Sequence, residues 1–582
     1  MTTLLSQVIH SSLSEWVAEL SQSDYRGHQV ELWTFNDQAS RAEAQRALRE
    51  LGIEAFIYSA YKPLVHFCLE STAMSESDSE QIEVRYPLNP HASEKRFLLE
   101  AYPLGALLQD KNVRFVADSN LTDRYQLNVT SKAGQTQSLF VLAPNLVRPD
   151  ATGAEQLSPT AWLRITNPEG KVIKDEALSS DYEQAYRAVM QVIAQHDWPN
   201  HAPYFQRLEI NIQLPTEDDA LGYDHEVISL REALHEDLYF SVQEWFKTRE
   251  GKNATARDCQ PGQIVPNITR CAGSQVHIDV ALTAYQHTHL THTAEVLASA
   301  GHPLSEQQVM FELETLGGEP FAAHTVSGKR VNATYIAGSD KAVVVSGGQH
   351  ANETTGVVGV LRAARLLSQQ ANAHLVISPL ENPDGYALHQ ELIQSNPHHM
   401  HHAARYTALG DDLEYRTAEP LYEKAIRKQA QALSQAQLHV NLHGYPSHEW
   451  TRPFSGYVPQ GFEMWTIPKG FFLVVRHLDT PQWQEYAERF VDALTLELQH
   501  CSEVIAMNRK QIALYEQHAG ETGFRMINGY PCFVSSVEQA DFPLQLITEY
   551  PDESIYGDDF IAGHTVQMET VLAAYRVHQS LS

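Results

Sequence analysis

The second half of the chain alternates short apolar runs with stretches of helical periodicity. Residues 343–345 are three valines that end at a glycine pair, residues 347–348. Such a β-branched run predicts a buried strand of a parallel sheet, followed by a tight turn. Beyond Glu353 the period changes, and the apolar residues lie on one helix face: Val357, Val360, Leu361, Ala364 and Leu367. We therefore predict a helix that begins near Glu353 and packs against the sheet.

Three further apolar runs in this half predict buried strands. They are HLVISPL at 374–380, QLHVNLH at 437–443 and LQLITEYPDE at 544–553. Each run is short and ends at polar or turn-forming residues, as buried strands commonly do. Turn formers at residues 382–385 follow the first of these runs, so we predict that the chain reverses there.

The first half of the chain shows more varied patterns. Residues 1–70 alternate helical and strand-like stretches and predict a small α/β unit, whereas the polar stretch 72–96 predicts a loop or linker. Helices are expected at 181–196 and 225–249. The β-like runs that predict strands are VRFVADS, RYQLNVTS, SLFVLAP, AWLRIT, RLEINIQLP, GQIVPNIT and SQVHIDVAL.

A domain boundary is predicted near residues 293–305, where a helix-like stretch ends at a glycine and a proline. We expect an N-terminal α/β region at 1–200 and a second α/β region at 201–299, which is either separate or part of the first. A C-terminal domain is expected at 300–582. The predicted fold class is α/β, with a mixed, mostly parallel sheet flanked by helices in this last domain.

Composition narrows the function classes. The chain has 582 residues, 43% of them hydrophobic, which is enough apolar material for two to four packed domains. Lys and Arg number 42 against 72 Asp and Glu, and the net charge of -30 argues against nucleic acid or an anionic membrane as a partner. No early stretch has the pattern of a membrane helix or a secretory leader, so a cytoplasmic location is expected. Five scattered cysteines fit reduced thiols.

Two histidine-rich stretches raise a metal hypothesis that we do not adopt. His287, His289 and His292 lie on a polar connecting stretch, where histidines are usually solvated. A second group lies on one polar loop: His398, His399, His401 and His402. Ligands so close in sequence rarely complete a tetrahedral site. We therefore interpret both groups as solvated.

The candidate chemistry lies at the predicted carboxyl ends of strands, where open α/β sheets place their sites. His350 and Glu353 follow the first strand, and His443 ends a second one. Two histidines and one glutamate on zinc leave a fourth position for water, as in a hydrolytic site. Glu549 lies at the end of a further strand. Its carboxylate can accept the proton of that water and pass it to a leaving nitrogen.

This part of the chain, residues 300–575, resembles the zinc carboxypeptidases of the M14 (funnelin) family. The resemblance rests on the order and spacing of HxxE, the NPDGY turn, an Arg before a GxDL segment, a strand-end His followed by Gly-Tyr, and a strand-end Glu near the C-terminus. It implies one zinc ion per chain, held by His350, Glu353 and His443. It also implies that Glu549 is the general base and acid.

The resemblance implies roles for three more residues. Arg405 would polarise the scissile carbonyl and stabilise the oxyanion, a task that suits an always-charged, forked donor. Asp412 falls where the family has a carboxylate bonded to the first zinc histidine, which would fix the tautomer of His350. Tyr530 is the candidate for the mobile tyrosine that the family has upstream of its catalytic glutamate.

One departure from the family concerns the leaving group. Glu414 and Tyr415 stand where the family has Asn-Arg, the pair that binds the terminal carboxylate of the substrate. A glutamate does not attract a carboxylate at neutral pH, and with Asp411 nearby the pocket is predicted to favour an amine or an uncharged group. Alternatively, Arg416 is a displaced substitute for the missing arginine. We expect a leaving group that is not an ordinary free C-terminal residue, such as an amine-bearing amino acid.

The sequence thus predicts a zinc metallopeptidase that cleaves a peptide or amide bond with an activated water. One alternative is a zinc deacylase of small N-acyl amino acids, of the succinylglutamate desuccinylase or aspartoacylase kind, because HANET at 350–354 is similar to the HxNE opening of those enzymes. The other is a non-catalytic binding module that keeps the fold. The NPDGY turn and the retained site residues favour the peptidase.

Overall fold

The computed structural model describes most of the chain, namely residues 1–71, 79–286, 294–458, 462–463 and 465–581. His287, His289 and His292 lie outside these ranges, as does the beginning of the predicted linker at 72–96. Among the described helices, none combines the length and the apolar character that a lipid bilayer would require.

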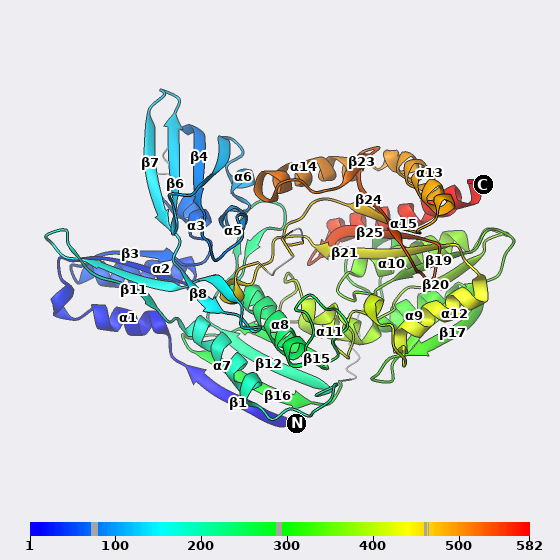
Figure 1. Ribbon diagram of the computed structural model, residues 1–582, viewed down its shortest axis with the longest axis horizontal. Coiled ribbons are helices and arrows are strands. Elements are labelled where there is room, and N and C mark those ends of the chain that lie inside the picture. The colour runs from blue at the N-terminus through cyan, green and yellow to red at the C-terminus, as the bar shows by residue number, and fades with distance from the viewer. Residues whose placement is uncertain (72–78, 287–293, 459–461, 464, 582) are drawn as a thin grey trace.

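A nine-stranded mixed sheet lies in the second half of the chain (Figure 1). Its spatial order is β17-β18-β20-β19-β21-β25-β22-β24-β23. The four central strands β20, β19, β21 and β25 run parallel, and antiparallel pairs flank them on both sides. The bounds are β17 Glu319–His324, β18 Arg330–Ile336, β19 Val343–Gly347, β20 Leu375–Ser378, β21 Leu438–Pro446, β22 Phe472–Leu478, β23 Arg525–Ile527, β24 Tyr530–Val537 and β25 Leu544–Glu553. The predicted α/β class with a mixed sheet is confirmed.

Helices cover both faces of this sheet because its central strands are apolar on both sides. Val343 and Val345 of β19 pack on one face with α10, α13 and α15, whereas Val344 packs on the other with Ala430 of α12. This alternation is the two-residue period of a strand buried on both faces. The helices are α9 Glu306–Thr315, α10 Thr354–Leu367, α11 Pro383–Leu392, α12 Ala425–Ser434, α13 Pro481–Glu497, α14 Ser502–Ala519 and α15 Gly557–Ser580.

A four-stranded sheet in the first half joins segments that are far apart in the sequence. Its order is β1-β16-β12-β15, so the first strand of the chain pairs with residues 276–283. The predicted regions 1–200 and 201–299 therefore contribute strands to one sheet. Its strands are β1 Thr2–Ile9, β12 Arg207–Leu214, β15 Gln263–Arg270 and β16 Val276–Thr283. The helices of this part of the chain are α7 Asp181–Gln195 and α8 Leu230–Arg249.

Two further four-stranded sheets lie in the first half, in the blue and cyan part of Figure 1. Their orders are β11-β10-β2-β3 and β5-β4-β6-β7. The bounds of these strands and of the other helices and strands in the first half are α1 Ser12–Leu20, β2 Gln29–Thr34, α2 Gln38–Glu50, β3 Glu54–Ser59, α3 Pro63–Glu70, β4 Ser79–Pro87, α5 Arg96–Glu100, α6 Leu104–Leu107, β5 Asn112–Asp118, β6 Arg124–Ser131, β7 Thr136–Leu142, β8 Asn145–Pro149, β9 Glu155–Pro159, β10 Ala161–Thr166, β11 Val172–Leu178, β13 Asp219–Ala220 and β14 Val227–Ile228.

Two local predictions were wrong. The stretch 72–96, expected to be a loop, contains β4, whose Ile82 and Val84 are completely buried at two-residue spacing. The turn expected at 382–385 is the beginning of α11, because the side chain of Asn382 accepts a hydrogen bond from the Gly385 backbone N–H and caps the helix. Proline in the first turn suits a helix start, since its missing N–H would have no partner there.

Carboxylates of helix α8, in the first half of the chain, pair with histidines of the second half. Glu232 pairs with His448 at 2.8 Å, and Glu236 pairs with His402. His399 pairs with Asp218 at 2.8 Å, and His401 is also buried. The prediction of a solvated histidine loop was therefore wrong for these three histidines. Carboxylates of the first half surround His399 and His402.

Candidate metal centre

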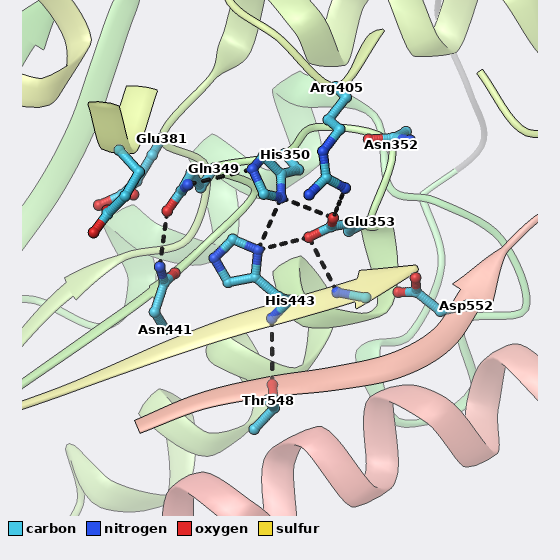
Figure 2. Close-up of polar contacts among 12 residues, drawn as sticks. Gln349, His350, Asn352, Glu353, Glu381, Arg405, Asn441, His443, Thr548 and Asp552 are labelled. Atoms are coloured by element: carbon cyan, nitrogen blue, oxygen red, sulfur yellow. Dashed lines mark hydrogen bonds and ion pairs between the residues drawn. The ribbon is translucent and has the colours of Figure 1, made fainter. Parts of the chain in front are cut away.

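Three side chains converge at the carboxyl ends of β19 and β21. His350 lies in the turn after β19, Glu353 directly precedes α10, and His443 lies near the end of β21. The Nδ1 atoms of the two histidines are 3.0 Å apart, and each lies 2.8 Å from an oxygen of Glu353 (Figure 2). All three side chains are buried. The structure thus brings together the three residues that the sequence assigned to a metal.

The donor set suits zinc. Two ligand atoms about 2.0 Å from a tetrahedral zinc ion stand about 3.3 Å apart. The candidate ligand atoms lie 2.8 to 3.0 Å apart, so a small side-chain adjustment would bring them to that separation. Imidazole nitrogens with a carboxylate oxygen are also the ligands of catalytic rather than structural zinc. The residues present therefore fit a zinc ion.

Asp412 lies behind His350, on the side away from Glu353. Its Oδ2 is 3.4 Å from Nε2 of His350, and its Oδ1 accepts from Nε2 of Gln349 at 3.3 Å. A carboxylate at Nε2 favours the tautomer that carries its proton there, which leaves Nδ1 free to bind a metal. Burial acts to raise the pKa of Asp412, but His350 and the neighbouring guanidinium groups hold it well below its usual value.

Glu353 is fixed by two donors besides the ring nitrogens of the histidines. The backbone N–H of Gly444 donates to its Oε2 at 3.0 Å, and Nη1 of Arg405 donates to its Oε1 at 2.6 Å. Although burial opposes the charge, His350, Arg405 and His443 together hold the pKa of Glu353 well below its ordinary value. Glu353 is therefore an anion at neutral pH, as a metal ligand must be.

Glu549 and Arg405 face the same cavity as the two histidines. Glu549 is the register partner of His443 on the adjacent parallel strand β25. Burial and the negative charge of Glu353 raise the pKa of its carboxyl group well above the ordinary value. A carboxyl group with a raised pKa can both accept and donate a proton near neutral pH.

Comparison with solved structures finds metallo-carboxypeptidases among the neighbours. One from Pseudomonas aeruginosa, in complex with (2-guanidinoethylmercapto)succinic acid, is 15% identical at a TM-score of 0.30 and covers 53% of this chain and 72% of its own. One from Burkholderia cenocepacia has the same identity and TM-score and covers 53% and 76%. Carboxypeptidase A from Helicoverpa armigera is 9% identical at 0.32 and covers 54% and 90%. No family model and no curated protein matches the chain.

The cavity above the metal ligands measures about 210 Å³. Aromatic side chains form part of its wall: Tyr406, Tyr415, Tyr445, Trp450, Phe462 and Trp465. Pockets for drug-sized ligands usually measure about 300 to 1,000 Å³, so this cavity admits a small group.

The contacts of the residues around the expected carboxylate pocket differ from those that the sequence-based interpretation assumed. Glu414 and Tyr415 do line the cavity, but Oε2 of Glu414 accepts from Nη1 of Arg427 at 2.6 Å. Asp411 and Arg416 are buried together, with Oδ1 and Nη2 at 2.6 Å. Because Glu414 and Asp411 already have cationic partners, they do not form the open anionic site that would favour an amine.

Tyr530 is not brought to the cavity. It begins β24, which is separated from β25 by β22, and it is fully buried. Its hydroxyl donates to the backbone oxygen of Leu498 at 2.9 Å. Tyr445, two residues after His443, lines the cavity instead.

Two carboxylates that the sequence analysis missed support the ligand loop. Asp552 Oδ2 accepts from the backbone N–H of Thr355 at 2.9 Å, at the start of α10, and Glu553 Oε2 accepts from Nδ2 of Asn352 at 2.6 Å. A Cβ at Gly444 would lie 2.0 Å from Oδ1 of Asp552, so only glycine fits there. The available signal was an acidic pair at the end of a strand and a helix start elsewhere in the sequence, since anions stabilise helix N-termini.

Proposed function

We propose that the protein is a zinc-dependent hydrolase of the metallocarboxypeptidase type that cleaves a peptide or amide bond. The observation that carries this proposal is the convergence of His350, Glu353 and His443, with Glu549 lining the same cavity as the two histidines. We further propose that residues 300–582 form the catalytic domain, because the whole nine-stranded sheet lies within them.

A zinc ion held by His350, Glu353 and His443 would supply a Lewis acid that acidifies water and polarises a carbonyl group. Glu549 accepts the proton of the attacking water and then donates it to the leaving nitrogen. Arg405 donates hydrogen bonds from its guanidinium group to the oxyanion. Asp412 keeps the ring of His350 in the metal-binding orientation.

A release assay combined with metal analysis tests the proposal. Full-length protein is loaded with zinc, its metal content is measured, and it is incubated with N-blocked dipeptides and with N-acyl amino acids. The proposal predicts one zinc per chain and release of an amine product, both lost in His443→Ala. Glu549→Gln should retain the zinc and lose turnover by a factor of about 10² to 10⁴. The exposed Glu538→Gln serves as the matched control.

A protein that binds no stoichiometric zinc, or one whose Glu549→Gln variant hydrolyses at the wild-type rate, contradicts the proposal. The second candidate function is deacylation of a small N-acyl amino acid. The small volume of the cavity favours it, because a short acyl group needs little space. Hydrolysis of N-acyl amino acids without hydrolysis of dipeptides would decide for this candidate.

A further inference from the structure

We propose that Arg257 and Arg476 form a carboxylate-binding subsite beside the metal centre, so that the N-terminal region supplies part of the substrate pocket. This inference rests on the proposed function and names the class of group that the site binds. Arg257 lies in the loop between α8 and β15, and Arg476 lies in β22. Both side chains line the same cavity as His350 and His443.

The other arginines near the cavity are already engaged. Arg416 pairs with Asp411 at 2.6 Å and with Glu423 at 3.0 Å, in the protein interior. Arg427 pairs with Glu381 at 2.5 Å and with Glu414 at 2.6 Å. Guanidinium groups saturated by buried carboxylates have no donors left for a ligand. Arg416 is therefore not the displaced carboxylate-binding residue that the sequence allowed.

Arg257 still has donors to offer. Its nearest carboxylate oxygen is Oδ2 of Asp412 at 3.8 Å, and no hydrogen bond from its guanidinium group is found within the described part of the chain. The group lies 5.3 Å from the ring centre of Tyr415 and 5.9 Å from that of Phe462. The side chain is 31% exposed. Aromatic rings thus orient a guanidinium group whose N–H donors remain available.

The backbone fixes Arg257 against the catalytic half. Its carbonyl oxygen accepts a hydrogen bond of 2.9 Å from the backbone N–H of Asp412, the residue that supports His350. A shift of this loop would therefore move Asp412 and disturb its contact with His350. Arg257 is placed for substrate binding by the same contact that places Asp412.

Arg476 is similarly available from the opposite half of the chain. Its Nη1 lies 3.6 Å from Oε1 of Glu414, beyond hydrogen-bond distance, and its side chain is 35% exposed. The charge of Glu414 is already matched by Arg427. Within the described residues, the guanidinium group of Arg476 donates no hydrogen bond to protein. It can therefore approach an anion in the cavity.

The charges of the cavity wall favour an anionic group. Arg257, Arg405 and Arg476 line it together with Asp412, Glu414 and Glu549. Asp412 interacts with His350, and Glu414 with Arg427, so their negative charges are compensated locally. Planar guanidinium groups bind carboxylates through paired hydrogen bonds.

The carboxylate could be the main-chain group of a free C-terminal residue or the side chain of an acidic leaving residue. Four probes separate these sources: acetyl-phenylalanine, acetyl-phenylalaninamide, acetyl-glutamate and acetyl-glutamic acid α-amide. Binding to the zinc-loaded full chain is measured by calorimetry. Preference for both free acids over acetyl-phenylalaninamide supports a main-chain carboxylate, whereas tight binding of the α-amide of acetyl-glutamate supports a side-chain carboxylate.

The variants Arg257→Met and Arg476→Met are each expected to weaken binding of the preferred acid at least tenfold and to lower the preference for acid over amide. Arg257→Lys should fall between wild type and methionine, because lysine keeps the charge but not the paired donors. The matched control is Arg525→Met. Arg525 lies on strand β23 and forms an exposed ion pair with Glu488.

Two results would overturn the subsite. One is binding of no acid by the zinc-loaded wild type. The other is that both methionine variants, while retaining zinc and wild-type thermal stability, prefer acid over amide as strongly as the wild type does. If an arginine variant does not fold, the lysine variants carry the test. Acid binding that depends on both arginines in a protein without hydrolytic activity would support the subsite while contradicting the proposed function.

Discussion

His443 and Glu549 are register partners on the neighbouring parallel strands β21 and β25. Adjacent strands lie about 4.8 Å apart, and partners in a parallel pair direct their side chains to the same face. The candidate metal ligand His443 and the carboxyl group of Glu549 are thus set side by side by sheet geometry alone. Their spacing depends on backbone hydrogen bonds rather than on a mobile loop.

Removing the carboxylate behind His350 should weaken the metal site. Asp412→Asn keeps the shape but removes the charge that favours the metal-binding tautomer, so we expect zinc affinity to fall by a factor of about 10 to 100. Competition with a chromophoric chelator measures this. The control is Asp411→Asn, whose carboxylate pairs with Arg416 and does not contact the ligands. Equal zinc affinity in Asp412→Asn and wild type would contradict the assigned role.

Replacing Arg405 by lysine should lower kcat more than it changes KM. Lysine retains a positive charge near Glu353 but cannot present two parallel donors, and the loss of oxyanion donors costs a factor of about 10² to 10³. Steady-state kinetics with metal analysis of the same preparation tests this. Full zinc content with wild-type kcat would show that Arg405 serves only to hold Glu353.

The pair between Glu232 and His448 should give the protein a pH-dependent stability. Burial acts to lower the pKa of His448, but Glu232 outweighs it and the pKa is raised. A raised folded-state pKa stabilises the protein fully below about pH 6.5, and the stabilisation is lost as the pH rises through the folded-state value.

We therefore expect Glu232→Gln to reduce the free energy of unfolding of the metal-free protein by about 3 kcal/mol at acidic pH and by less in alkaline buffer. Urea unfolding at both pH values measures the difference. The exposed Glu314→Gln, on α9, is the control. The same loss at both pH values would mean that the two side chains do not interact as an ion pair.

Lys469 should destabilise the protein at low pH. It is completely buried, its Nζ has no hydrogen-bond partner among the described residues, and the rings of Tyr445 and Trp465 lie 4.7 and 4.9 Å from it. Burial lowers the pKa of Lys469 to about 7, with Glu549 opposing the shift. The cost of burying the charge is then largest below pH 7 and fades toward the ordinary pKa of lysine near 10.4.

Lys469→Met should accordingly raise the free energy of unfolding of the metal-free protein in acidic buffer, with an advantage that shrinks as the pH approaches 10. Each unit of pKa shift corresponds to about 1.4 kcal/mol, so the gain should be measurable by urea unfolding. A variant less stable than wild type at every pH would show that the contacts between Lys469 and the rings outweigh the cost of burial.

Hydrophobic periodicity predicted elements of the nine-stranded sheet because its signals are local. The valines of β19, the apolar face of α10 and the run that forms β25 each contain their own pattern, and the structure shows them as strand, helix and strand. The cap at Asn382 is also local, but its side-chain hydrogen bond to Gly385 resembles a turn signal in the sequence.

The interactions that change the interpretation of the site are not local. The pairing of Glu414 with Arg427 depends on how α12 packs, and the contact of Arg257 with Asp412 joins segments from different halves of the chain. The histidines at 399 and 402 looked solvated because their carboxylate partners, Asp218 and Glu236, belong to the first half. A single sequence does not show such tertiary partners.

The pairing of β1 with β16 sets an order for biosynthesis. Residues 2–9 leave the ribosome long before residues 276–283, which supply their hydrogen-bonding partner. At about 5 to 20 residues per second, the first strand waits for tens of seconds without its neighbour. Nascent chains halted before residue 276 should therefore be readily cleaved near their N-terminus, whereas longer ones should resist the protease there.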